Sequence, residues 1–360
     1  MRFKRFLVVF FIASFILLSM NCYINFKYDL YGIFDKNFNI SRYPYVNEHY
    51  SKMDYLVNNR VESFDSIIFG SSRCKGINPS LFLEKAYNLA YPAGIPSDYL
   101  DDIKILLDNR IIPRKIYIGL DDFSYKREPS EVHSVINFNG YKSRLENLKY
   151  KIALLTKKPS TATYKYMLNR LYEDKCLYNI EKDGSIVEEN RRIIYDWRQY
   201  VYEKRFKNPT IFSEKNKRTH IVIDEIKLIK KMCDENGIEL VLFITPTHIT
   251  TYLYDDIDNF NEFKRALTNI APVYDFSTIN NVTVNNYYWK ETSHARKIVL
   301  DMIANRLCNN MEMEYPKNFC VIANGNNIDE HIKNLKNERI MYIKETHPQY
   351  IPSNNKEEYL

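Results

Sequence analysis

The stretch Ser66–Arg73 reads SIIFGSSR, and it joins a short apolar run to a turn that contains two serines. An apolar run of this length bounded by glycine is typical of a buried strand. Gly70 allows the chain to turn sharply off the strand, so that Ser72 points out of the sheet edge. The stretch therefore predicts a strand of a sheet with a serine at its carboxyl end.

The residues around this stretch alternate short apolar runs with helical patterns, which predicts a parallel sheet covered by helices. We expect further strands at Ala86–Leu89, Lys115–Leu120, Ile238–Thr245 and Val273–Phe276. Helices are expected over 97–107, Thr219–Glu235 and Ala295–Met311, with Ser97 as an N-cap. In the last helix, Ile298 is expected on one face with Met302, Ile303 and Leu307. The predicted fold class is a three-layer, doubly wound α/β domain.

A second informative motif, Glu291-Thr-Ser-His294, stands near the end of the same α/β pattern. A serine hydroxyl is a weak nucleophile until a base takes its proton, and the base needs a third group to orient it. We therefore assign Ser72 as candidate nucleophile, His294 as general base and Glu291 as its orienting partner. Two plainer interpretations stay open: a polar turn after a strand, and an acid–histidine pair at a helix start. Ser293 or a backbone carbonyl is an alternative orienting group for His294.

These motifs resemble those of the SGNH (GDSL-like) hydrolase superfamily. Gly70-Ser71-Ser72 is similar to the family's first Gly-Asp-Ser block, and Glu291-x-x-His294 to its last Asp-x-x-His block, with glutamate for aspartate. The Gly-Ser-Ser form is typical of the exported, membrane-anchored branches, including proteins of teichoic-acid alanylation and glycan O-acetylation. The resemblance covers roughly Ile67 to Leu307, with a large central insertion, and implies a flavodoxin-like sheet.

The resemblance also implies the groups that stabilise an oxyanion: the backbone N–H of Ser72, Gly94 from the second block, and an asparagine from the third. The third block here reads Gly119-Leu-Asp-Asp122, so Asp121 stands in the asparagine position. A carboxylate cannot donate a hydrogen bond unless it is protonated. Asp121 therefore has a structural role, or that donor is absent. Asn88 is expected to buttress the Ser72 turn.

Two further residues are candidates for substrate binding. Arg73, next to the proposed nucleophile, could hold an anionic group of a donor or polymer, or be an ordinary arginine on a helix surface. His248 follows the predicted strand Ile238–Thr245, at the edge where sites collect in open α/β sheets. It could line the pocket or be a loop histidine.

Composition narrows the class of protein. The chain has 360 residues, of which 45% are hydrophobic and 27% charged, and this composition suffices for a well-filled core. The net charge is +6, and the basic residues are spread among acidic ones. This charge pattern argues against a nucleic-acid partner. Glycine-rich phosphate loops are missing from the sequence, so no nucleotide cofactor is expected. The six cysteines show no CxxC pair, which argues against a metal site and leaves room for one disulfide.

The N-terminus carries an apolar run, Phe6–Met20, preceded by Arg2, Lys4 and Arg5. Spanning a bilayer takes about 20 residues, which the run reaches if the next few residues help. Basic residues before a span stay cytoplasmic, which places the remainder outside. We therefore expect an uncleaved, single-pass membrane anchor with an extracytoplasmic domain. A cleaved signal peptide and a buried helix are the alternatives.

These expectations divide the chain into an anchor over 1–27, a tether over 28–62, an α/β domain over 63–311 and a C-terminal extension over 312–360. An insertion at about 123–218 is expected to fold over the active edge as a lid or substrate wall. It contains helix-like segments at Tyr141–Thr156, Thr161–Cys176 and Glu188–Lys207, and a turn at Lys182–Gly184. The extension contains strand-like runs at Phe319–Ala323 and Ile340–Lys344.

Together, the resemblance implies a serine esterase or O-acyltransferase that forms an acyl-enzyme on Ser72 and acts on a cell-surface glycan, without a cofactor. A transferase of this kind would need a multipass membrane partner to supply acyl groups. The alternative is a non-catalytic glycan-binding or assembly subunit on the same fold, because a fold does not imply a function. Asp121 and Glu291, which depart from the family pattern, favour that alternative.

Overall fold

The computed structural model describes residues 2–29, 31–34, 47–58, 63–127, 144–158, 179–187, 199, 203–211, 218–309 and 314–346. The chain forms two compact units, one of residues 1–61 with 133–191 and one of residues 62–132 with 192–360. The expected helix Thr161–Cys176 and most of the expected helical run Glu188–Lys207 lie outside the described residues.

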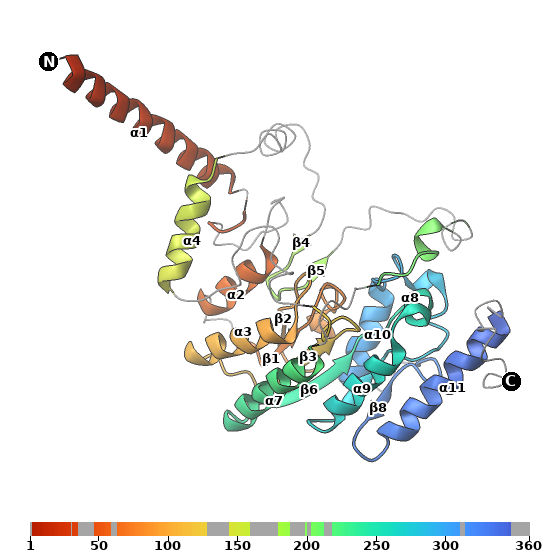
Figure 1. Cartoon of the computed structure of the whole chain (residues 1–360). Coiled ribbons are helices and arrows are strands. Elements are labelled where there is room, and N and C mark those ends of the chain that lie inside the picture. Colours follow the sequence, from red (N-terminus) through yellow and green to blue (C-terminus); the bar gives the residue numbers. More distant parts are fainter. Residues whose placement is uncertain are drawn as a thin grey trace. The chain divides into compact units, whose positions relative to one another are not determined.

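The second unit is built on a six-stranded sheet in the order β2-β1-β3-β6-β7-β8 (Figure 1). The strands are β1 (Ser66–Phe69), β2 (Ala86–Asn88), β3 (Lys115–Leu120), β6 (Glu239–Ile244), β7 (Val273–Asp275) and β8 (Val321–Ala323). All neighbours pair in parallel except β7 and β8, which are antiparallel. The prediction of an α/β fold with five parallel strands is confirmed, and the sixth strand makes the sheet mixed.

The strand order reverses direction next to β1. From β1 the chain goes to β2 on one side, and then returns to β3 on the other side before continuing to β6 and β7. Open α/β sheets bind ligands at such a reversal, outside the carboxyl ends of the strands. Ser72 follows β1 and Asp121 follows β3, so both stand at this position.

Helices cover both faces of this sheet. Ile68, Tyr117 and Phe243 point to one face, where they pack in one hydrophobic cluster with residues of α10 (Lys297–Leu307). Because side chains alternate along a strand, their neighbours point to the other face. That face carries α3 (Pro96–Asp108), α7 (Thr219–Glu235) and α9 (Ile257–Thr268), which pack on one another (Figure 1). The structure also describes α8 (Ile249–Tyr254), α11 (Ile328–Thr346) and the 3-10 turns η2 (Pro79–Leu81), η4 (Lys204–Phe206) and η5 (Asn286–Tyr288) in this unit.

Two predicted details of these helices are wrong. Ser97 does not cap α3, because the helix already begins at Pro96 with Ile95 at the N-cap, and proline is pre-organised for a first helical position. Ile298 is exposed, whereas Val299 is fully buried. The apolar residues of α10 fit two adjacent helical rows, and the row that contains Val299 faces the sheet.

The C-terminal extension completes the sheet. The expected strand at Phe319–Ala323 is confirmed as β8, but the expected strand at Ile340–Lys344 is wrong, since these residues lie within α11. Ile328 and Ile332 pack on Ala323, with the spacing of one helical face. Asp275 at the end of β7 lies 2.9 Å both from the Lys264 ammonium and from the His331 ring, which ties α11 to the sheet.

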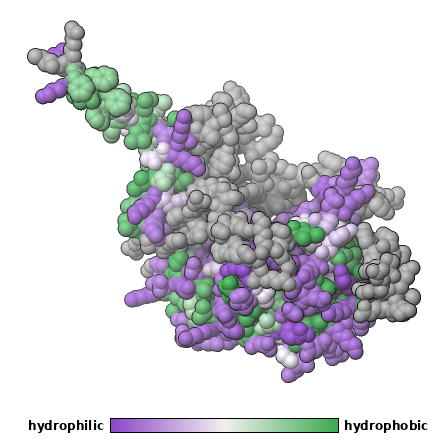
Figure 2. Space-filling view, in the orientation of Figure 1, coloured by the Kyte–Doolittle hydropathy of each residue, from purple (hydrophilic) through white to green (hydrophobic). Residues whose placement is uncertain are grey.

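The first unit contains α1 (Arg2–Tyr28), α2 (Glu48–Asn58), α4 (Arg144–Thr156) and the hairpin β4 (Asn179–Ile180) with β5 (Ile186–Val187). The predicted helix at Tyr141–Thr156 is confirmed as α4, and the predicted turn at Lys182–Gly184 joins β4 to β5. Over Phe3–Tyr28, α1 is long and apolar enough to cross a membrane, and none of its most apolar window is buried. Figure 2 shows its hydrophobic surface.

Gly119 in β3 lies directly against Cys74, in the turn that follows Ser72. A Cβ atom there would overlap the Cys74 sulfur and approach the Phe243 ring to 2.7 Å. We expect Gly119→Ala to lower the free energy of unfolding by about 1–3 kcal/mol, because packed cores resist added atoms. Urea unfolding followed by tryptophan fluorescence measures this, with Gly325→Ala as the control, since nothing lies within 4 Å of a Cβ there. Equal midpoints for the two variants would contradict the expectation.

Candidate active site

Hydrogen bonds from Asn88 hold the turn that carries Ser72. The Asn88 amide, at the end of β2, donates to the carbonyl oxygens of Cys74 at 3.0 Å and Ile77 at 2.8 Å. Its carbonyl oxygen accepts from the Ala90 N–H at 2.9 Å. Asn88 is fully buried, whereas Ser72 is only half-buried. The arrangement holds the turn on the sheet and leaves the serine within reach of solvent.

Ser72, His294 and Glu291 form a continuous chain of hydrogen bonds. The Ser72 Oγ lies 2.8 Å from His294 Nε2, although the two residues stand 222 positions apart. Glu291 Oε1 bonds His294 Nδ1 on the opposite side of the ring. A carboxylate at Nδ1 fixes the tautomer whose Nε2 accepts a proton. The three side chains can therefore move the Ser72 proton onto the imidazole.

Glu291 is held in its ionised form. Burial acts to raise the pKa of this carboxyl, but the hydrogen bond and the charge of His294 outweigh burial. The backbone N–H of Ser293 adds a bond to Glu291 Oε2 at 2.8 Å. The result is a pKa below the ordinary 4.5. The longer side chain of glutamate thus reaches the histidine and keeps its charge.

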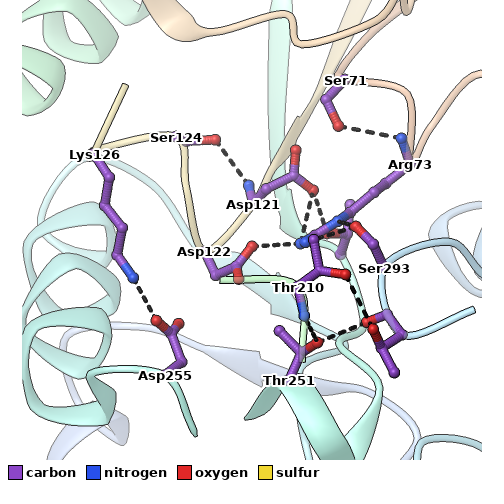
Figure 3. A network of polar contacts seen from close by, with 12 residues as sticks. Ser71, Arg73, Asp121, Asp122, Ser124, Lys126, Thr210, Thr251, Asp255 and Ser293 are labelled. Atoms are coloured by element: carbon purple, nitrogen blue, oxygen red, sulfur yellow. Dashed lines mark hydrogen bonds and ion pairs between the residues drawn. The ribbon is translucent and has the colours of Figure 1, made fainter. Parts of the chain in front are cut away.

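Arg73 joins the loop that carries Glu291, Ser293 and His294, here called the histidine loop, to the turns after β1 and β3. Its guanidinium bonds Asp122 and lies 3.7 Å from Asp121 Oδ1. Its Nε and Nη2 donate to the Ser293 hydroxyl at 3.3 and 3.2 Å (Figure 3). The side chain is 3% exposed, and the nearby carboxylates keep its pKa raised against the effect of burial. The alternative of an ordinary arginine on a helix surface is therefore wrong, because the guanidinium is buried and joins three segments of the chain.

Asp121 pairs with Arg73 and does not donate a hydrogen bond into the site. Its side chain is fully buried, it accepts a bond from the Thr245 hydroxyl, and its N–H donates to Ser124 Oγ at 2.9 Å. Burial raises the pKa of this carboxyl, although Arg73 acts in the opposite direction. Of the two roles expected for Asp121, the structure gives the structural one.

Gly94 lies close beside the turn that carries Ser72. A Cβ on it would come within 2.9 Å of the Gly70 carbonyl oxygen and 2.8 Å of the Tyr99 hydroxyl. Only glycine fits this approach. Its N–H, however, closes a turn by donating to the Tyr91 carbonyl at 3.3 Å. In this conformation that donor is engaged within its own loop.

His248 has a structural place instead of lining a pocket. It caps α8, its Nδ1 accepts from the Thr250 N–H at 3.2 Å, and its Nε2 lies 2.7 Å from the Asn286 side-chain oxygen. The ring packs between Phe206 and Trp289 and is almost fully buried. Burial lowers the pKa of this histidine, which favours the neutral ring.

Sequence patterns did not predict the threonine contacts that hold the loop with Glu291 and His294. Thr251 Oγ1 donates to the Thr292 carbonyl at 2.8 Å and accepts from the Thr210 N–H at 3.0 Å. The Thr210 and Thr292 hydroxyls lie 3.0 Å apart. Residues 203–211, which belong to the expected insertion, thus support the loop that carries Glu291 and His294. Asp122 was also missed, although it stands next to Asp121. Ser293, which was considered as an alternative orienting group for His294, instead accepts hydrogen bonds from Arg73.

Within the described residues, no three His, Cys, Asp or Glu side chains gather in a way that could hold a metal ion. The five described cysteines are free thiols, and Cys176 lies outside the described part. A scan of protein-family models and a search of the curated proteins each find no match to this chain.

We expect Arg73→Ala to lower the free energy of unfolding by about 3–5 kcal/mol, because it leaves two carboxylates buried without their counter-charge. Urea unfolding measures the loss. Lys297→Ala is the matched control, since its ion pair with Asp301 is exposed and such pairs contribute little. Similar midpoints for the two variants would show that the Arg73 contacts are energetically minor.

Glu291 should contribute to stability in a pH-dependent way. A carboxyl whose pKa is lowered by folding stabilises the folded state fully above its unfolded pKa and loses that contribution as pH falls through its folded pKa. The stability difference between the wild type and Glu291→Gln should therefore shrink as the pH falls below 4.5. Urea midpoints over a pH series measure this, and a difference that grows on acidification would contradict it.

Proposed function

We propose that this protein is a serine esterase or O-acyltransferase that forms an acyl-enzyme on Ser72. The observation that carries the proposal is the hydrogen-bonded series of Ser72 Oγ, the His294 ring and the Glu291 carboxylate. It stands at the carboxyl ends of the strands, next to the reversal between β1 and β3. Nucleophile, base and orienting acid are the parts that acyl transfer requires.

In the proposed reaction, Ser72 Oγ attacks the carbonyl carbon of an ester while His294 Nε2 takes the hydroxyl proton. The tetrahedral intermediate then expels the alcohol, which leaves with that proton. Water or a sugar hydroxyl next attacks the acyl-serine, giving its proton to His294, and Ser72 recovers a proton when the acyl group leaves. Glu291 stabilises the charged imidazole in both half-reactions.

The accessibility of the site fits a large acceptor. The side chains of His294 and Glu291 are 40% and 35% exposed, and Ser72 is half-buried. A polymer can reach such a site from solvent without entering a closed pocket. We therefore propose a cell-surface glycan as the acceptor or acylated substrate.

The resemblance to the exported SGNH branches supplies the rest of the proposal. The helix α1 would be an uncleaved anchor, with the basic residues before it cytoplasmic and the α/β unit outside. A transferase reaction would then need a multipass membrane partner to deliver acyl groups, since a single helix offers them no route.

One observation favours a second candidate function, a non-catalytic glycan-binding or assembly subunit. An oxyanion needs preorganised donors, and Asp121 is buried in contacts with Arg73 and Thr245. The Gly94 N–H also closes its own turn. The Ser72 N–H is the remaining donor among the three that the resemblance implies.

The full-length protein in detergent should react with a fluorophosphonate probe, which labels only activated serines. Ser72→Ala and His294→Ala should abolish labelling, and Glu291→Gln should slow it by roughly 10⁴-fold, as loss of the orienting acid does in known triads. In-gel fluorescence over time measures the rates.

Ser71→Ala is the matched control, because Ser71 is the adjacent serine and is fully buried without a histidine partner in the described structure. It should keep its labelling. A folded wild type that stays unlabelled, but retains acetylated glycan on an affinity column, would favour the binding function. Labelling that persists in Ser72→Ala would place the reactive serine elsewhere.

A further inference from the structure

The helix α1 is longer than a membrane requires. Its 27 residues extend about 40 Å at 1.5 Å each, whereas the hydrocarbon core of a bilayer is about 30 Å thick. With Phe6 at one edge of the hydrocarbon, the roughly 20 residues that cross it end near Asn25, so the end of α1 lies at the layer of lipid headgroups. What this end contacts therefore lies at the membrane surface.

The end of α1 contacts the carboxyl end of α4. The Asn25 amide donates to the carbonyl oxygens of Leu155 at 2.7 Å and Lys157 at 2.8 Å, and the Asn21 amide donates to that of Thr156 at 3.1 Å. These are the carbonyl groups that an α-helix leaves without partners at its end. Two side chains of α1 thus hold α4 at the level where α1 leaves the hydrocarbon. Figure 1 shows α4 running across the direction of α1.

The helix α4 carries apolar side chains on two faces. Its inner face holds the buried Asn147, Tyr150 and Leu154, and Tyr150 packs on Tyr50 of α2. Its outer face carries Leu145, Leu148 and Ile152, which are 62%, 55% and 50% exposed. Their spacing of three and four residues makes one continuous apolar stripe on the helix surface.

The junction of the two helices has the composition of a membrane interface, where aromatic rings and lysines gather at the headgroup level. The Lys27 ammonium lies over the rings of Tyr23 and Tyr28, and that of Lys157 lies 5.5 Å from the Tyr31 ring centre. Lys149 is exposed beside the apolar stripe, where its long side chain can reach anionic headgroups.

From these contacts we infer that α4 lies in the surface of the membrane that α1 crosses, with Leu145, Leu148 and Ile152 inserted at the boundary of headgroups and acyl chains. An amphipathic helix binds there through its apolar face and the basic residues beside it. The inference rests on the proposed membrane anchor and is independent of the chemistry at Ser72. It gives the first unit a second membrane contact, which fixes its orientation relative to the bilayer.

The test uses the full-length protein reconstituted in vesicles of phosphatidylcholine with a minor share of phosphatidylglycerol. Leu148→Trp and Ile152→Trp place a fluorophore on the stripe, and Glu146→Trp places one on an exposed position outside it. The emission of the wild type, from Trp197 and Trp289, is subtracted. Replacing part of the phosphatidylcholine by its form with brominated acyl chains should remove most of the added emission of the first two variants and little of the third.

Phe11→Trp reports separately on α1. Strong quenching at position 11 without quenching at 148 and 152 would show an inserted anchor and overturn the inference alone. Absence of quenching at all positions would overturn both the anchor and the inference. Emission at 148 and 152 could instead be unquenched by brominated lipid and shift in wavelength with the protein-to-lipid ratio. This result would identify a second copy of the chain as the partner that covers the apolar stripe, and it would also overturn the inference. Probe labelling at Ser72 is read on the same samples and reports on the proposed function.

Discussion

The site depends on the hydrogen bonds and ion pairs of the buried Arg73 guanidinium. A charge that is 3% exposed is costly unless it is paired and fully hydrogen-bonded. The guanidinium meets this condition by reaching Asp122 after β3 and Ser293 in the histidine loop. Its own backbone is adjacent to Ser72. One side chain therefore sets the spacing between the nucleophile turn, the central strand and the base.

This arrangement explains how residues so far apart in the chain form one hydrogen-bonded series. The strands bring their carboxyl ends to one edge, but strand pairing alone does not place a long loop such as the one that carries His294. Arg73 holds that loop from one side, and Thr210 and Thr251 hold it from the other. Arginine suits this role because its planar group donates in several directions at once, which lysine cannot do.

Much of this could be predicted from the sequence, for identifiable reasons. The strands were predictable because each is a short apolar run between polar turns, and Ser72, Glu291 and His294 stood in recognisable motifs. The roles of Arg73 and His248 were not, because a charged or titratable residue near a strand end looks the same in sequence whether it faces solvent or a buried partner. Their roles are decided by contacts with Asp122 and Asn286, which are distant in the chain. The helix over Ile340–Lys344 was missed because short apolar runs fit a strand and a helix equally well.

The antiparallel strand β8 has a consequence for the order in which the protein can be completed. Among the described residues, β8 (321–323) covers the edge of β7, and His331 bonds Asp275 and so holds α11 next to this edge. While the chain is being made from its N-terminus, every catalytic candidate exists before the sheet has its last strand. The exposed β7 edge is meanwhile open to pairing with other chains. Strand β8 therefore protects the edge of β7 in the newly made domain. A chain whose synthesis stops before β8 leaves this edge unpaired.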